Sequence, residues 1–125
     1  MIIAIDFDGI IAETKNLEII SLIPDAKEII NQLAKDGHRI IIWTCRYIIE
    51  HLVEMNRFLI ANRIMFHAVN INDPREQPLL GFWPDKKIYA DVYIDDHNLG
   101  GFPGWKTAYE IINKMEVKDV RKAFC

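Results

Sequence analysis

The apolar positions of the chain are grouped in short runs rather than spread evenly. Residues 1–5 and 39–44 are largely β-branched runs that lead directly to polar residues. Runs of this kind are typical of strands that are buried on both faces of a sheet. Two shorter runs predict further strands at residues 66–71 and 90–94. The pattern therefore predicts four short strands.

Three segments have the spacing of amphipathic helices. The first begins at Pro24 and Asp25, which suit the first turn of a helix, and Gly37 is the expected residue just beyond its end. The second spans residues 48–62 and the third residues 105–115. The buried side of the second helix is predicted to consist of Leu52, Met55, Leu59 and Ile60.

The remaining segments show no clean period. Residues 10–23 mix apolar and charged positions, so we expect irregular structure or a small flap there. Residues 72–84 contain three prolines and one glycine, which is typical of a loop with turns. The tail, residues 116–125, is expected to be helical or frayed.

The alternation of strands and helices predicts right-handed crossovers and a parallel sheet covered on both faces. Residues 1–125 are expected to form one α/β domain, because a domain typically takes roughly 100–200 residues. In such sheets ligands bind beyond the carboxyl ends of the strands. We therefore expect the polar residues that follow separate strands to converge on one crevice.

Composition narrows the class of protein and its location. The 125 residues carry a formal charge of −3 and no long run of like charge, so the chain has no electrostatic footprint for nucleic acid. No apolar run approaches the roughly 20 residues of a membrane span, and the apolar start lacks the basic region of a signal peptide. The two cysteines, Cys45 and Cys125, suggest no disulfide framework and fit a reducing compartment. We expect a cytoplasmic protein.

The sequence Asp6-Phe7-Asp8-Gly9 directly follows the first strand. One carboxylate can attack a phosphorus atom and form an aspartyl-phosphate, while the other protonates the leaving oxygen and then activates water. A phosphate beside these carboxylates needs a cation, for which Mg²⁺ is the natural choice. Gly9 lets the backbone turn closely around the phosphate and offers its N–H. Taken alone, however, an Asp-x-Asp pair is more often the start of a turn.

Polar residues after the other strands favour the catalytic interpretation of the Asp-x-Asp pair over a simple turn. Asp95 and Asp96 end the fourth strand, and Thr44, which can bind a phosphate oxygen without adding charge, ends the second. Paired acids at the ends of two buried strands are costly unless a cation lies between them. Lys86 and Lys87 precede the fourth strand and can neutralise the phosphate or the nucleophile, with a solvated loop pair as the alternative.

The ordered motifs IIAIDFDG, RIIIWT, a lysine of DKK, and DVYIDD resemble those of the haloacid dehalogenase superfamily of phosphohydrolases. The match covers most of the chain, up to about residue 101. The resemblance implies a three-layer α/β/α, Rossmann-like domain with a central, mostly parallel sheet. It also implies that Asp6 is the nucleophile and Asp8 the general acid/base, whose backbone carbonyl helps to hold Mg²⁺.

The same resemblance implies the other site residues. Thr44 would bind phosphate together with the backbone N–H of Cys45, and the two acids of the fourth strand would bind Mg²⁺ directly or through water. Lys87 is favoured over Lys86, because small members with a similar strand tend to carry lysine at that spacing. The implied phosphate-binding residues are Gly9, Thr44, Cys45 and Lys87. The implied metal-binding residues are Asp6, Asp8, Asp95 and Asp96.

Two features depart from the usual pattern of that superfamily. Ile10 stands where a threonine usually supports the loop. Residues 10–23 are too few for a cap domain, and residues 45–85 are used by a helix, a strand and a loop, so we expect a capless, open site. Such a site suits a large phosphorylated substrate that supplies its own lid, or a neighbouring subunit of a homo-oligomer that covers it.

The sequence thus predicts a Mg²⁺-dependent phosphomonoester phosphatase that acts on a sugar phosphate, a nucleotide or a larger phosphorylated molecule. Two alternatives stay open: a magnesium-binding, receiver-like or interaction module without turnover, and a phosphatase for nucleic-acid ends. Receiver domains typically lack the Asp-x-Asp pair at the end of the first strand, and the acidic balance counts against nucleic acid.

Four further residues near these motifs have two interpretations each. Arg46 either faces the phosphate or caps the surface of the next helix. Three aromatic residues could stack on a sugar or base, although such residues more often pack in the core or in turns. They are Phe82, Trp83 and Trp105.

Overall fold

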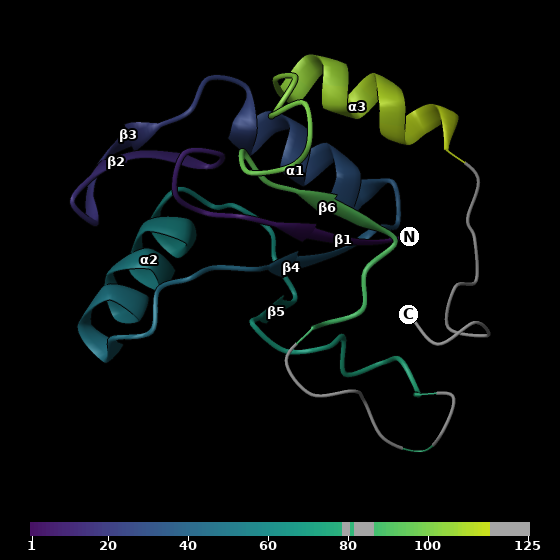
Figure 1. Ribbon diagram of the computed structural model, residues 1–125, viewed down its shortest axis with the longest axis horizontal. Coiled ribbons are helices and arrows are strands. Elements are labelled where there is room, and N and C mark those ends of the chain that lie inside the picture. Colours follow the sequence, from purple (N-terminus) through teal and green to yellow (C-terminus); the bar gives the residue numbers. More distant parts are fainter. Residues whose placement is uncertain (79–80, 82–86, 116–125) are drawn as a thin grey trace.

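Four parallel strands form the centre of the molecule (Figure 1). The computed structural model describes residues 1–78, 81 and 87–115. The strand order is β5-β4-β1-β6, and each neighbouring pair is parallel. The strands are β1 (Ile2–Ile5), β4 (Arg39–Ile42), β5 (Ala68–Val69) and β6 (Val92–Ile94).

The register of the strands brings three carboxyl ends to one level. Ile5, the last residue of β1, lies opposite Ile42 of β4 and Ile94 of β6, which also end their strands. All strands of a parallel sheet end at the same edge, so the residues that follow these three strands emerge side by side. The predicted parallel α/β sheet is confirmed, although β5 and β6 are shorter than the apolar runs that predict them.

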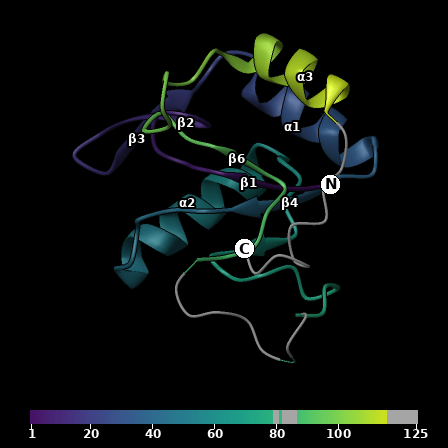
Figure 2. The same cartoon turned by 45° about the vertical axis from the view of Figure 1, so that its right-hand side comes forward.

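Three helices flank the sheet, as expected. Figure 2 shows two of them, α1 and α3, lying side by side, and the Tyr109 hydroxyl of α3 donates a hydrogen bond of 2.9 Å to the Asp36 carboxylate at the end of α1. The helices are α1 (Ala26–Lys35), α2 (Ile49–Ala61) and α3 (Trp105–Lys114).

Gly37, the residue predicted just beyond the first helix, ends α1. Gly37 has a φ of +96°, in the left-handed region that glycine adopts readily. Its N–H donates to the carbonyl of Ala34 at 3.1 Å, and the N–H of His38 donates to the carbonyl of Leu33 at 3.1 Å. This pair of hydrogen bonds is a Schellman motif, which satisfies the last carbonyls of the helix.

The predicted buried side of α2 is wrong at one position. Met55 and Leu59 are fully buried and Leu52 packs against the core, but Ile60 is 67% exposed. The first three residues are three and four positions apart and therefore share one face. Ile60 follows Leu59 directly, and one step along a helix turns the side chain away by about 100°.

The two faces of the sheet bury separate clusters, because alternate residues of a strand point to opposite sides. One face packs against apolar residues of all three helices, including Ile30, Leu59 and Ile112. On the other face, the covering residues that the structure describes come from the segment 88–90 together with Trp43, rather than from a helix. The strand residues on that second face are Ile2, Ala4, Ile41, Ala68 and Tyr93.

Residues 10–23, for which a flap was one expectation, form a hairpin of two short strands. β2 (Ala12–Lys15) and β3 (Glu18–Leu22) are antiparallel, and the turn between them places Asn16 and Leu17 at φ values of +51° and +69°. Two successive residues with positive φ are typical of the tight turns that join paired strands. The hairpin is far smaller than a domain, and the described residues contain no cap domain.

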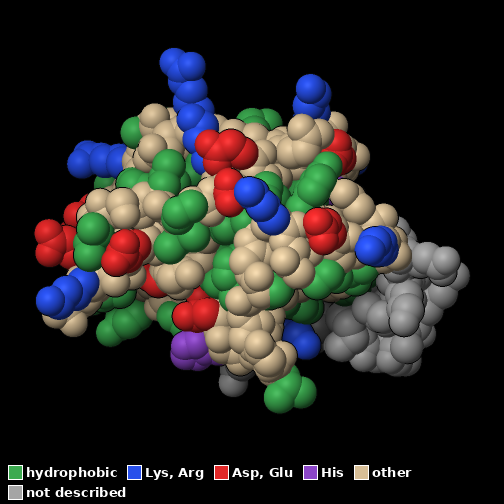
Figure 3. All heavy atoms as spheres, turned by 90° about the horizontal axis from the view of Figure 1, so that it is seen from above, with side chains coloured by type: hydrophobic (Ala, Val, Ile, Leu, Met, Phe, Trp, Pro, Cys, Tyr) green, Lys and Arg blue, Asp and Glu red, His purple; other side chains and the backbone are tan. Residues whose placement is uncertain are grey.

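The surface seen from above α3 mixes acidic, basic and apolar side chains (Figure 3). None of the helices within the described ranges is long and apolar enough to cross a membrane. Some sequence predictions lie outside the described residues, namely those for Phe82, Trp83, Lys86 and residues 116–125.

Candidate active site

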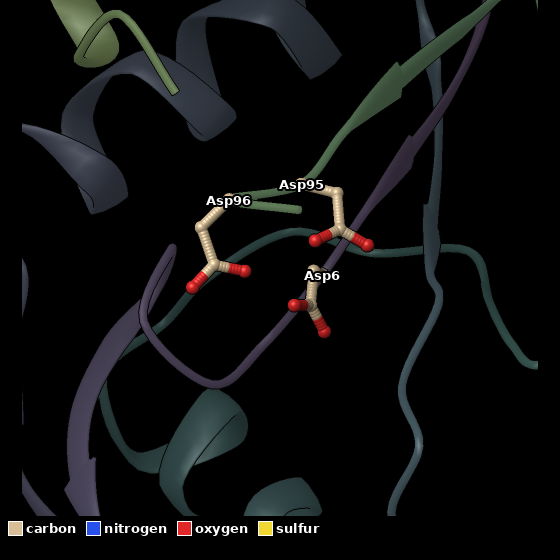
Figure 4. A group of neighbouring side chains, drawn as sticks. All are labelled: Asp6, Asp95 and Asp96. Atoms are coloured by element: carbon tan, nitrogen blue, oxygen red, sulfur yellow. The ribbon is translucent and has the colours of Figure 1, made fainter. Parts of the chain in front are cut away.

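Three aspartates meet at the carboxyl edge of the sheet. Asp6 follows β1, and Asp95 and Asp96 follow the neighbouring strand β6. One carboxylate oxygen from each of them lies within 4.8 Å of one oxygen from each of the others. Figure 4 shows the three side chains turned toward a common space. We call these residues the acidic trio.

Hydrogen bonds fix the backbone that carries the trio. The N–H of Asp6 donates to the carbonyl of Ile94 at 2.9 Å, which extends the pairing of β1 and β6 by one step. The N–H of Phe7 donates to the Asp6 carboxylate at 2.9 Å, and the N–H of His97 donates to the Asp95 carboxylate at 2.9 Å. Each of these two carboxylates therefore has one oxygen oriented by a neighbouring backbone N–H.

The electrostatics of Asp6 differ from those of an ordinary carboxyl group. Its pKa is raised from 3.8 to about 7, first by burial and then by the negative charge of Asp95, with smaller contributions from Asp96 and Asp8. The hydrogen bond from the N–H of Phe7 acts in the opposite direction. A half-buried carboxyl group among other carboxylates resists ionisation unless a cation compensates the charge.

The donor set of the trio fits a hard divalent cation. Carboxylate oxygens are the protein ligands that Mg²⁺ prefers, at about 2.0–2.1 Å from the ion. Two ligands on opposite sides of one such ion are then about 4.2 Å apart. The 4.8 Å spread of the trio is close to this value, so small side-chain movements suffice to bring the three oxygens around one ion. The trio is therefore a candidate cation site.

Gly9 allows the loops after β1 and β6 to approach each other. Its φ is +81°, and a Cβ atom at this position would lie 3.1 Å from a carboxylate oxygen of Asp96. A side chain would therefore be both strained and crowded against the trio. The N–H of Gly9 donates to the carbonyl of Ala12 at 2.8 Å, so this predicted phosphate donor is used within the loop.

Asp8 is not one of the three grouped aspartates, and its carboxylate is held by Arg46. The guanidinium donates from Nη2 to one Asp8 oxygen at 2.8 Å and from Nε to the other at 3.0 Å. The Arg46 side chain is completely buried, whereas the Asp8 side chain is 29% exposed. The Arg46 side chain is therefore directed inward to Asp8, and its Nη1 also lies 3.4 Å from the carbonyl of His51 in the first turn of α2.

Thr44 is buried just beyond β4, and Asn70 at the end of β5 fixes its backbone. The Thr44 N–H donates to the Asn70 side-chain oxygen at 2.8 Å, and the Asn70 amide donates to the Thr44 carbonyl at 3.0 Å. The Thr44 hydroxyl oxygen accepts a hydrogen bond of 3.1 Å from the N–H of Arg46. Cys45, between them, is exposed. No local sequence pattern indicates Asn70, because it becomes a neighbour of Thr44 only through the pairing of β4 with β5.

Lys87 lies on the face of the sheet to which the Ala4 side chain points. Its ammonium group is 5.1 Å from the centre of the Tyr93 ring, and Tyr93 packs against the cluster that contains Ala4. Asp6 is two residues beyond Ala4, and residues two apart in a strand point to the same side. This geometry leaves Lys87 as a candidate partner of the phosphate.

Two other predicted residues have structural roles. Ile10 is fully buried, and its carbonyl accepts a hydrogen bond of 2.8 Å from the indole N–H of Trp105. Trp105 is only 3% exposed, so it packs in the core and is not available for stacking on a sugar or base. The larger apolar side chain at position 10 therefore stabilises the loop by burial.

Comparison with known proteins places the chain beside one solved structure. Neither the protein-family models nor the curated proteins contain a match to it. The solved structure of a conserved protein coded by a locus of Bacteroides thetaiotaomicron is 36% identical in sequence, with a TM-score of 0.79. The alignment covers 100% of this chain and 98% of the Bacteroides chain. The chain therefore belongs to the same family as this conserved Bacteroides thetaiotaomicron protein.

Proposed function

We propose that this protein is a Mg²⁺-dependent phosphatase of the haloacid dehalogenase superfamily, with Asp6 as its nucleophile. The observation that carries the proposal is the acidic trio at the carboxyl edge of a parallel sheet. The motif resemblance described above assigns roles to the same residues. Mg²⁺ bound by the trio would neutralise the carboxylates and orient the phosphate of the substrate.

The proposed reaction has two steps. In the first, a carboxylate oxygen of Asp6 bonds to phosphorus, the bond from phosphorus to the substrate oxygen breaks, and Asp8 gives that oxygen a proton. In the second, Asp8 takes a proton from water, whose oxygen bonds to phosphorus while the bond to Asp6 breaks. The products are an alcohol and inorganic phosphate, and both aspartates return to their initial states.

The remaining site residues support phosphate binding. Thr44 is held at the same edge of the sheet by Asn70, and Lys87 lies on the side of the sheet from which Asp6 emerges. A hydroxyl and an ammonium group together can stabilise the charge that develops on the transferring phosphoryl group. A site without a cap domain suits a phosphate that projects from a larger molecule.

The first test compares the wild type with Asp6→Asn on p-nitrophenyl phosphate. We expect Mg²⁺-dependent hydrolysis that EDTA abolishes, and a loss of kcat of roughly 1,000-fold or more in the variant, because the nucleophile is removed. Asp36→Asn is the matched control, since Asp36 is an aspartate on the surface between α1 and α3. A panel of sugar phosphates, nucleotides and phosphorylated polymers then identifies the substrate class.

A different outcome would support the alternative of a metal-binding module. In that case Mg²⁺ would raise the melting temperature of the wild type, while wild type and Asp6→Asn would show equal, negligible hydrolysis across the whole panel. Such a result would refute the proposed phosphatase and leave only the cation site.

A further inference from the structure

Arg46 is the most completely buried charged group near the site. Its side chain is 0% exposed, and its guanidinium carbon lies 5.1 Å from the centre of the Phe7 ring. Burial of a charge without partners is strongly unfavourable, so a buried arginine indicates that its hydrogen bonds are specified by the fold.

The hydrogen bonds of Arg46 join three segments of the site. Two of them reach the carboxylate of Asp8 in a fork. A third, from Nη2, reaches the carbonyl of Leu17 in the turn of the β2–β3 hairpin at 2.9 Å, and a fourth, from Nη1, reaches the carbonyl of His51 in the first turn of α2 at 3.4 Å. With these donors engaged, the side chain has little capacity left for a phosphate.

We propose that Arg46 is a positioning residue for the reaction, which fixes the carboxylate of Asp8 and couples it to the β2–β3 hairpin. This inference rests on the proposed function of Asp8 as general acid and base. A planar guanidinium that binds both oxygens of a carboxylate fixes its orientation as well as its distance. Correct orientation matters because a displacement of about 1 Å at a catalytic group can lower the rate roughly 100-fold.

The structure offers a matched control for this pair. Arg39, at the other end of β4, makes the same kind of fork to Asp73, with Nε and Nη2 at 2.9 Å and 3.1 Å from the two carboxylate oxygens. Asp73 is buried, and its pair lies at the amino edge of the sheet, away from the trio. Loss of that pair should lower stability without changing the chemistry.

The experiment measures kcat and KM of Arg46→Lys, Arg46→Gln and Arg39→Gln with p-nitrophenyl phosphate and with an alkyl phosphate, alongside Asp8→Asn. We expect Arg46→Gln to lose roughly 10- to 100-fold in kcat with little change in KM. The loss should be greater for the alkyl phosphate, whose leaving oxygen needs the proton from Asp8. Arg46→Lys should recover part of it, and Arg39→Gln should keep wild-type kcat at a lower melting temperature.

A double-mutant cycle separates positioning from a general structural role. If Arg46 acts through Asp8, adding Arg46→Lys to Asp8→Asn should cost little further activity. A rise in KM with unchanged kcat would show instead that Arg46 binds the phosphate. Equal losses for both substrates, or full additivity with Asp8→Asn, would also overturn the inference while the proposed phosphatase stands. Inactivity of the wild type would refute both.

Discussion

At the scale of single residues, the candidate site depends on a glycine, Gly9, as well as on its aspartates. Gly9 combines a positive φ with a close approach to Asp96, whereas Gly37 has a positive φ in open space. The two glycines therefore separate the cost of backbone strain from the effect of crowding the acidic trio.

Gly9→Ala is expected to lower both stability and cation affinity. A left-handed conformation costs a residue with a side chain roughly 1–2 kcal/mol, which both Gly9→Ala and Gly37→Ala should lose in free energy of unfolding. Only Gly9→Ala places a methyl group against Asp96, so only this variant should bind Mg²⁺ more weakly. Urea unfolding and calorimetric titration with Mg²⁺ measure the two effects. Equal Mg²⁺ affinity of both variants would contradict this account of the loop.

At the scale of elements, strand order decides which side chains meet. The aspartates of the trio and Thr44 were predictable, because they lie at the ends of apolar runs and parallel strands end at one edge. Asn70 was not predictable in this way. It is 26 positions from Thr44 in the sequence, and its role depends on the pairing of β4 with β5.

Asn70→Gly is expected to weaken phosphate binding. Asn70 has a φ of +54°, so glycine fits the backbone without strain and the variant removes only the two hydrogen bonds to Thr44. Each such bond contributes about 1 kcal/mol, and a loosened Thr44 should raise KM roughly 10-fold. Steady-state kinetics with Mg²⁺ test this. Asn62→Gly is the control, because the Asn62 amide donates to the carbonyl of Phe58 in the adjoining helix α2 at 2.8 Å. An unchanged KM for Asn70→Gly would remove Thr44 from the phosphate site.

Features that depend on a local sequence signal were predicted, and features that depend on the packing of distant segments were not. The Schellman end of α1 could be predicted because a single glycine determines it. The exposure of the Ile60 side chain was not predicted, because the sequence does not distinguish an apolar residue beside the buried face of a helix from an apolar residue on that face. The fork between Arg46 and Asp8 spans 38 positions, and no local spacing indicates it.

At the scale of the whole molecule, the stability of the fold and the proposed cation site are linked through Asp6. Its pKa is 3.8 before the shift and about 7 in the folded protein, so between these values the folded state binds a proton that the unfolded state has released. The contribution of Asp6 to the free energy of unfolding therefore decreases as the pH rises through that window. A bound divalent cation replaces the proton and removes this loss.

Mg²⁺ is thus expected to stabilise the protein more at about pH 7 than at about pH 4. Thermal unfolding with and without Mg²⁺ across this range measures the effect. His38 and His67 have lowered pKa values, both mainly because of burial, and they act in the opposite direction by destabilising the fold as the pH falls. The contribution of Asp6 is therefore the difference between wild type and Asp6→Asn. An identical Mg²⁺ effect in the two proteins at every pH would contradict the role of Asp6 in the cation site.

In the proposed reaction, a phosphoryl group passes through Asp6. The most direct measurement is mass spectrometry of the peptide that contains Asp6, after acid quenching of the protein during turnover with Mg²⁺ and a phosphomonoester. We expect this peptide to gain the mass of one phosphoryl group in the wild type and in the slow Asp8→Asn variant, and to gain nothing in Asp6→Asn. Turnover that continues in Asp6→Asn, or a phosphoryl group found on another residue, would contradict it.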